Sequence, residues 1–439
     1  MAERGPAARR GAAPPPRAPG RQLLLVAAAL LLTAAARTQT PLSLDKWRTH
    51  LLDRNLPDIA VFVLPGDLDG DGRPDIVAGD AWYANPGQPG GTWVRKPIGE
   101  PFGNVAAVYD FDGDGDLDLL GTQGRGPETN AAFAWARNDG KGGFEVLTNL
   151  AKGDGDFLQG VAVARFGGKG SPLGVALSWH GEGFGLQLLQ VPGGPATEPW
   201  TVRGLSPTSL TEDLSVGDVD GDGDLDLVLG TVWLEAPTWT THRLGRVDDL
   251  KGVGRQPAPD RNDLADIDGD GDLDVVVGLE GGTDVLWFEN PRPGGDVKGS
   301  WSRHVIGTSR GMGLSMDTAD MDNDGDPDVV IGEHRGVRVN RVMIFENRGA
   351  GKEWPVHVVH ARSTRPDRPP RRDPGRRHRR GRRPRHHLDR VEVPEAVALR
   401  EPRDHQGVRR GRRPRPGPRE PAGPSLARPE PARLSGRPA

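Results

Sequence analysis

The residues of this chain that are best suited to chemistry are aspartates, which recur in one nine-residue phrase. The phrase has Asp at its first, third, fifth and ninth positions and Gly at its sixth, and it occurs five times. A glycine at the sixth position permits the sharp turn that brings carboxylates around a single cation. We therefore expect these aspartates to be metal ligands: Asp67, Asp69, Asp71, Asp75; Asp110, Asp112, Asp114, Asp118; Asp218, Asp220, Asp222, Asp226; Asp266, Asp268, Asp270, Asp274; Asp320, Asp322, Asp324 and Asp328.

Calcium is the cation that this phrase fits best. Ca²⁺ takes six to eight oxygen ligands, which the carboxylates and a backbone carbonyl of one folded loop can supply, whereas Mg²⁺ usually binds together with substrate phosphates. Without a cation the carboxylates would repel one another, which disfavours a merely solvated acidic turn. Five copies of one set also argue against catalysis by these residues. An EF-hand loop requires Glu at position 12, and that position holds Ala78, Gly121, Leu229, Val277 or Ile331.

Short strands must position these loops. Each acidic phrase is followed by a Val-, Leu- or Ile-rich run that ends in Gly, as in residues 275–278. An aromatic phrase precedes each copy, often as Trp-x-x-His (Trp47 with His50, Trp301 with His304), and a third phrase follows, as in residues 287–290. These short runs, separated by Gly, Asp, Asn and Pro, indicate about four strands in a unit of about fifty residues. The pattern predicts an all-β fold, a β-propeller rather than a stacked solenoid.

One copy of the unit lacks the acidic residues. Residues 165–173 fit the frame of the phrase without a carboxylate, and Lys169 stands at a ligand position. We expect no calcium there and propose that the Lys169 ammonium replaces the charge of the ion.

The N-terminal residues 1–37 resemble a signal peptide. Arginines precede an apolar run over residues 23–36, which ends in small residues. Fourteen apolar residues are too few for a permanent span, although a short membrane anchor is the alternative interpretation. The chain has no cysteine, so a secreted or periplasmic protein of this size depends on its core or on metal rather than on disulfides. We expect a secreted protein without a membrane span.

Charge is distributed unevenly along the chain. Residues 38–360 carry 27 basic and 51 acidic residues, whereas the net charge of the whole chain is only −4. A body this acidic repels nucleic acid and anionic lipid and attracts cations. Nucleic acid is therefore not an expected partner.

The acidic phrase resembles that of the FG-GAP/VCBS repeat family, which is also found in the head of integrin α-chains. The resemblance extends from about Trp47 to His360. It implies a seven-bladed propeller over residues 38–360, with calcium in the hairpin between the first two strands of a blade. Asp67, Asp69, Asp71 and Asp75 match the calcium loop of the family residue by residue, as do their counterparts.

The far ends of the second strands should form a face for a ligand. A second strand that leaves the calcium loop ends on the opposite side, where a polar and aromatic ring would suit a carbohydrate or an extracellular protein. The expected ring residues are Asp80, Trp82, His180, Glu182, Trp233, Glu333 and His334. The alternative interpretation is that the tryptophans pack between blades and the polar residues are solvated.

Two classes of function remain. The repetition favours a non-catalytic adhesion or ligand-binding module outside the cell. The alternative is a calcium-dependent polysaccharide-degrading lyase or glycosidase, for which His180 with Glu182 and Glu333 with His334 are the candidate acid–base pairs. The sequence does not identify the ligand.

The C-terminal residues 361–439 differ from the rest of the chain. They contain no Lys, Ile, Asn, Phe, Tyr or Trp, and Arg and Pro dominate, so we expect a disordered tail. Shifted by one nucleotide, the codons of residues 375–393 can spell Ala-Ala-Asp-Ile-Asp-Gly-Asp-Gly-Asp-Leu-Asp-Ile-Ile-Ser-Ile-Gly-Trp-Lys, and those of residues 399–403 can spell Phe-Glu-Asn-Arg. The tail is therefore interpreted as an out-of-frame translation that replaces a seventh blade and leaves six in frame. A genuine basic tail that binds polyanions is the alternative.

Overall fold

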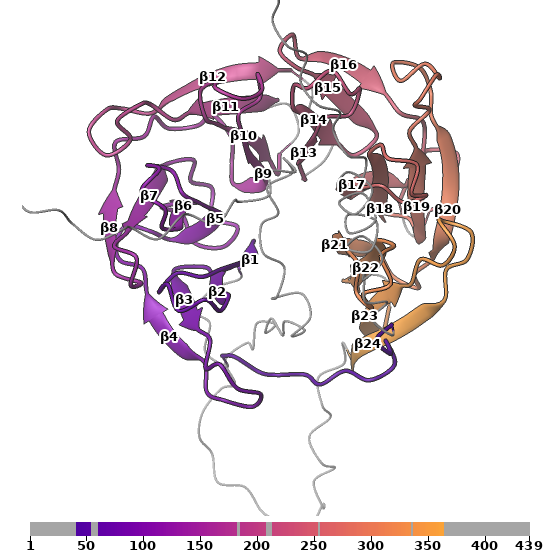
Figure 1. The fold of residues 1–439 in the computed structure, drawn as a ribbon, viewed down its shortest axis with the longest axis horizontal. Coiled ribbons are helices and arrows are strands. Elements are labelled where there is room, and N and C mark those ends of the chain that lie inside the picture. Colours follow the sequence, from indigo (N-terminus) through magenta and orange to yellow (C-terminus); the bar gives the residue numbers. More distant parts are fainter. Residues whose placement is uncertain are drawn as a thin grey trace, which may run out of the picture. The chain divides into compact units, whose positions relative to one another are not determined.

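The part of the chain that the structure describes folds into six antiparallel sheets of four strands each (Figure 1). The computed structural model describes residues 41–53, 60–181, 185–207, 213–252, 255–334 and 337–363. Within these ranges the chain forms strands and turns but no helix, and so none that could cross a membrane. The all-β propeller expectation is confirmed, with six blades. The proposed signal peptide (1–37) and the tail from residue 364 lie outside the described residues.

Each blade is a meander in which strands follow one another from the inside outward. The first three blades comprise β1 (Val63–Gly66), β2 (Asp75–Ala78), β3 (Ala81–Ala84) and β4 (Val94–Pro97); β5 (Asn104–Tyr109), β6 (Asp118–Thr122), β7 (Phe133–Asn138) and β8 (Phe144–Leu147); and β9 (Leu158–Ala164), β10 (Gly174–Trp179), β11 (Leu186–Gln190) and β12 (Thr201–Ser206). The last three comprise β13 (Ser215–Gly217), β14 (Asp226–Leu229), β15 (Val232–Glu235) and β16 (Thr240–Arg243); β17 (Ala258–Ala265), β18 (Asp274–Glu280), β19 (Asp284–Glu289) and β20 (Ser302–Thr308); and β21 (Gly313–Ala319), β22 (Asp328–Glu333), β23 (Val339–Phe345) and β24 (Val356–Ser363).

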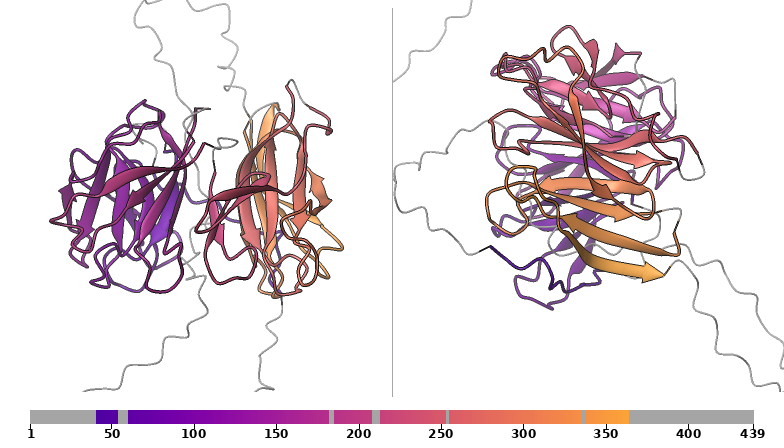
Figure 2. Two further views of the ribbon diagram at one scale, coloured as in Figure 1. Left: turned by 90° about the horizontal axis from the view of Figure 1, so that it is seen from above. Right: turned by 90° about the vertical axis from the view of Figure 1, so that its right-hand side faces the viewer.

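The second strand of each blade is buried on both faces. Every residue of β2, β6, β10 and β14 is buried, which explains why these runs are continuously apolar instead of alternating. Neighbouring blades contact each other through their first strands, from β1 and β5 through to β17 and β21. Apolar clusters fill the spaces between sheets; one of them joins Trp233 of the fourth blade to Val275 and Val277 of the fifth. Figure 2 shows the hairpin loops at the ends of the upright strands.

The aromatic phrase belongs to the outer strand of the preceding blade. Trp301 lies directly before β20, and its indole Nε1 donates a hydrogen bond to the Val297 carbonyl at 2.8 Å. Trp354, close to the start of β24, bonds to the Gly351 carbonyl in the same way. Trp354 therefore completes the sixth blade and does not begin a seventh.

The N-terminal segment 41–53 joins the sixth blade to the first. Leu44 and Trp47 pack in an apolar cluster against the sixth blade, and the Leu42 amide donates to the Asp322 carbonyl at 2.7 Å. At the other end Asp53 accepts a hydrogen bond of 3.0 Å from the Tyr83 hydroxyl of the first blade. Figure 1 shows this indigo segment running from β24 toward the first blade. It therefore covers faces of two sheets that are not neighbours in sequence.

Candidate metal sites and ligand face

All five acidic phrases form the hairpin loop between the first and second strands of a blade, as expected. We number the six corresponding loops in chain order: loop 1 (67–75), loop 2 (110–118), loop 3 (165–173), loop 4 (218–226), loop 5 (266–274) and loop 6 (320–328). In each acidic loop three aspartates offer oxygens that all lie within 4.8 Å of one another. The structure thus brings together three of the four sequence-predicted ligands of each acidic loop.

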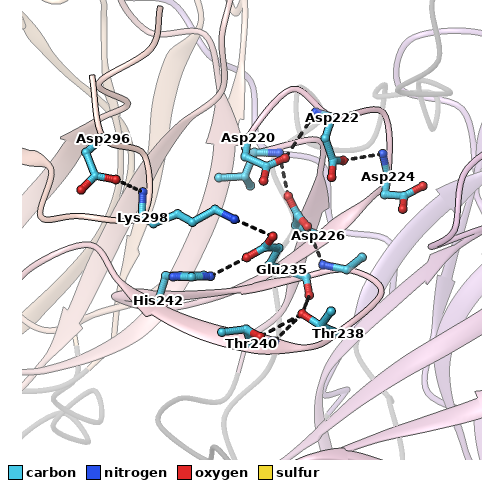
Figure 3. Close-up of polar contacts among 12 residues, drawn as sticks. Asp220, Asp222, Asp224, Asp226, Glu235, Thr238, Thr240, His242, Asp296 and Lys298 are labelled. Atoms are coloured by element: carbon cyan, nitrogen blue, oxygen red, sulfur yellow. Dashed lines mark hydrogen bonds and ion pairs between the residues drawn. The ribbon is translucent and has the colours of Figure 1, made fainter. Parts of the chain in front are cut away.

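Backbone amides hold the carboxylates of each acidic loop in place. In loop 4, Asp218 accepts hydrogen bonds from the amides of Gly221 at 2.8 Å and Gly223 at 3.2 Å. Asp220 accepts one from Asp222, and Asp222 accepts one from Asp224 at 2.9 Å (Figure 3). The two glycines have φ values of 77° and 96°, a conformation that costs glycine little. The loop is therefore folded around its carboxylates by its own backbone.

The aspartate at the ninth position of each acidic loop is fully or almost fully buried. Asp118 is fully buried, and its two oxygens accept hydrogen bonds from the amides of Phe111 and Asn138. Burial raises the pKa of Asp118 to about 7, helped by repulsion from Asp112 and Asp114 and opposed by the two backbone hydrogen bonds. The ninth aspartates of loops 4, 5 and 6 have a pKa of about 7 for the same leading reason, burial. A cation beside these groups would favour their ionised form.

Loop 3 is organised by an arginine. Arg165 occupies the first position, and its Nη1 donates a hydrogen bond of 2.6 Å to the Ser171 carbonyl at the seventh. In calcium-binding loops a seventh-position carbonyl is a typical ligand. The guanidinium of Arg165 thus bonds to this loop carbonyl, and the replacement of the ion's charge by Lys169 stays a prediction.

Histidine and glutamate pairs recur near the acidic loops, and sequence reasoning missed them. His242 lies 2.8 Å from Glu235, which also accepts a 2.6 Å bond from Lys298 of the next blade (Figure 3). His304 lies 2.7 Å from Glu289 in the corresponding place. The sequence did carry a signal for these pairs, because the aromatic phrase often contains His and the third phrase often contains Glu. These pairs join the third strand of a blade to its fourth.

The opposite ends of the second strands carry some of the expected ligand-face residues. Asp80 lies in the β2–β3 turn, 2.5 Å from Arg95 and 3.8 Å from Arg125. His180 follows β10, stacks on Phe157 and lies 3.1 Å from Asp156. His334 is exposed after β22. Glu182 lies outside the described residues.

Trp82 and Trp233 do not belong to this face, which corrects the sequence-based expectation. Both side chains are fully buried inside third strands. Trp82 packs under Lys96, whose Nζ lies 4.0 Å from the ring centroid. Trp233 stacks on His242 with 4.5 Å between ring centroids. Their indoles fill the core, because aromatic area is most stabilising when it is removed from water.

Glu333 is also unavailable to a ligand. Its carboxylate is buried and accepts hydrogen bonds from the amides of Arg310 and Gly311 and from the guanidinium of Arg341. Burial alone would raise the pKa of Glu333, but these hydrogen bonds lower it further than burial raises it. A carboxylate held ionised by so many donors is a poor general acid. The expected acid–base pair of Glu333 with His334 is therefore not supported.

Two segments of the chain, residues 67–121 and 266–331, match the FG-GAP-like repeat. No curated protein matches the sequence. Among solved structures, the biofilm matrix protein Bap1 of V. cholerae is 16% identical with a TM-score of 0.34, covering 64% of this chain and 45% of its own, so the chain spans less than half of that protein. BBS1N in complex with ARL6DN is 13% identical with a TM-score of 0.44, covering 72% of this chain and 87% of its own. A Bacillus licheniformis rhamnogalacturonan lyase is 18% identical with a TM-score of 0.36, covering 66% and 63%.

Proposed function

From the premise that this chain is a six-bladed β-propeller carrying FG-GAP-like repeats, we propose that it is a secreted, calcium-stabilised binding module without catalytic activity. Its partner is a carbohydrate or an extracellular protein. The observation that carries the proposal is the repetition of one carboxylate cluster in the same hairpin of five blades. A carboxylate cluster that occurs in five blades is expected to stabilise the scaffold, because an active site usually occurs once in a protein.

The donor set of the acidic loops supports calcium. All candidate ligands are hard oxygens, which suit Ca²⁺. Ninth-position carboxylates are buried with raised pKa values, as at Asp274, and a bound cation would offset both burial and mutual repulsion. In loop 3, which lacks the aspartates, the positive group of Arg165 bonds to the loop. A positive group bonded to the loop that lacks the aspartates agrees with a need for positive charge in the other five loops.

We propose that the partner binds at the ends of the second strands away from the acidic loops. Asp80, His180 and His334 lie there in turns of three different blades. His180 leaves about half of its side chain exposed beside Asp156, so an aromatic and charged surface is open to a sugar or a peptide. Export rests on the signal-peptide pattern of residues 1–37.

The calcium proposal is tested by removing the ion. Saturation by a ligand at 100 times its Kd stabilises a protein by about 2.7 kcal/mol per site, so excess chelator should lower the Tm strongly, and added calcium should restore it. Magnesium at the same concentration is the control and should restore little. A Tm that does not respond to chelation would contradict the calcium proposal.

The binding proposal is tested on arrays of polysaccharides and extracellular proteins. We expect His180→Ala to weaken binding of any captured ligand without changing calcium content, while Lys352→Ala, a change in the β23–β24 connection, leaves binding intact. Release of unsaturated products or reducing ends from a polysaccharide would replace the proposal by the enzymatic alternative.

A further inference from the structure

An asparagine at the end of the third strand connects neighbouring acidic loops. In the sixth blade the Asn347 amide nitrogen of the backbone donates to Asp328, the ninth residue of loop 6, at 2.8 Å. The Asn347 side chain donates from Nδ2 to the carbonyl of Ile267, the second residue of loop 5, also at 2.8 Å. Asn347 is fully buried. One residue therefore touches two candidate metal sites in different blades.

The contact on loop 5 falls between two expected ligands. Ile267 lies between Asp266 and Asp268, and its own amide donates to Asp274 at 3.0 Å. Both peptide groups of Ile267 are thus fixed, one by its own loop and one by the next blade. Holding the Ile267 carbonyl orients the peptide group that leads to Asp268.

The same link occurs in two further blades. Asn138 donates to the Leu68 carbonyl of loop 1 at 2.9 Å, and its backbone amide donates to Asp118 of loop 2. Asn290 donates to the Val219 carbonyl of loop 4 at 3.0 Å, and its backbone amide donates to Asp274 of loop 5. Arg292 adds a second bond to Val219.

The asparagine link is missing between loops 2 and 3 and between loops 3 and 4. Val191 and Ala236 occupy the asparagine position in the third and fourth blades, and their backbone amides donate to the Leu173 carbonyl and to Asp226 respectively. Neither side chain can donate a hydrogen bond. In the first blade the Asn85 side chain donates within its own loop, to Pro74. Asparagine links therefore join loop 1 to loop 2 and loops 4, 5 and 6 to one another.

We propose that these asparagines couple calcium binding, so that the acidic loops fill as two groups, loops 1 and 2 and loops 4, 5 and 6, separated by the metal-free third blade. This inference rests on the proposed calcium binding. An ion in loop 6 fixes Asp328 and with it Asn347, which orders the Ile267 region of loop 5 before its own ion arrives. Because part of the ordering cost has already been met, the second ion binds more tightly, and the effect is reciprocal.

Hydrogen–deuterium exchange of the full chain, followed by mass spectrometry during a calcium titration, reports each loop separately. Asp268→Ala disables loop 5. We expect the calcium midpoints of protection in loops 4 and 6 to rise about fivefold, within the usual range of coupling between sites, while loops 1 and 2 keep their midpoints.

Asn347→Ala then separates the link from general damage. In this background Asp268→Ala should no longer shift the midpoint of loop 6 but should still shift that of loop 4, which Asn290 and Arg292 connect. Asn85→Ala is the matched control and should leave the response of loop 6 unchanged. Alanine is compatible with the position, since Ala236 occupies it in the fourth blade.

Two results would overturn the coupling. One is a loop 6 that still responds to Asp268→Ala without Asn347, and the other is an equal response of loops 1 and 2. Failure of the calcium proposal looks different, because no loop of the unmutated protein would then gain protection from calcium.

Discussion

Asp268 and Lys169 lie in corresponding hairpin loops of different blades, and only the substitution of Asp268 should change the number of bound calcium ions. Asp268 belongs to one of the five carboxylate clusters, whereas loop 3 holds its carbonyl with Arg165. We expect five calcium ions per chain by equilibrium dialysis, four after Asp268→Ala, and still five after Lys169→Ala. Five ions in the Asp268→Ala protein would show that Asp268 is not a required ligand.

Trp233 illustrates how a residue type can mislead when its burial is unknown. Its indole is fully buried and packs in the cluster between the fourth and fifth blades. Trp233→Ala should therefore lower the free energy of unfolding by about 3–5 kcal/mol, as is usual for such truncations. Urea unfolding in saturating calcium measures this loss, and a change below about 1 kcal/mol would contradict the burial.

At the scale of elements, segment 41–53 is attached to the sixth blade by a histidine between two carboxylates. His357 of β24 has Asp45 2.8 Å from Nδ1 and Glu346 2.6 Å from Nε2; Arg348 also pairs with Glu346. Burial lowers the pKa of His357, but the hydrogen bonds to Asp45 and Glu346 raise it more, so that it lies above the ordinary value of a histidine. Only the protonated ring can donate to both carboxylates.

This arrangement makes the attachment of the segment depend on pH. A pKa raised on folding means that the stabilisation is complete below about pH 6.5, the unfolded value, and is lost as pH rises through the folded value. His357→Gln should therefore cost about 1 kcal/mol at pH 5.5 and less at pH 8.5, measured by urea unfolding in saturating calcium. The same loss at both pH values would contradict a protonated His357.

At the scale of the whole molecule, segment 41–53 bears on the question of a seventh blade. Trp47 donates its indole N–H to the Leu44 carbonyl at 2.7 Å, the local bond that Trp301 and Trp354 make where outer strands begin. Segment 41–53 thus shares this indole hydrogen bond with the outer strands, although it packs on the sixth blade. We propose that it is the fourth strand of a seventh blade, whose first three strands are encoded in the shifted frame of the tail.

Restoring that frame should complete the molecule. Sequencing the gene across codons 360 to 378 tests the shift directly, and the restored protein should bind six calcium ions, because the shifted codons spell another acidic phrase. Its Tm should also exceed that of the present chain, since a seventh sheet would cover apolar faces that, among the described residues, segment 41–53 covers. An intact frame, with tail peptides found in the native protein, would refute this.

The sequence by itself determined the repeat, the all-β class and the position of the acidic loops. These depend on local rules: glycines permit the turn of each loop, and short apolar runs bounded by Gly, Asp and Pro form strands. Asp67 and its counterparts therefore lie where their spacing placed them, between the first two strands of a blade. The absence of the aspartates from loop 3 was equally visible, because it needs only residue identity.

Only the tertiary structure decided which side chains are available and which blades they join. Asp80 and Trp82 are two residues apart, yet one lies in a turn and the other is fully buried between sheets. Glu333 loses its candidate role to donors from Arg310, Gly311 and Arg341. Asn347 reaches Ile267 across 80 positions. Such contacts depend on how whole sheets pack, which spacing along the chain does not specify.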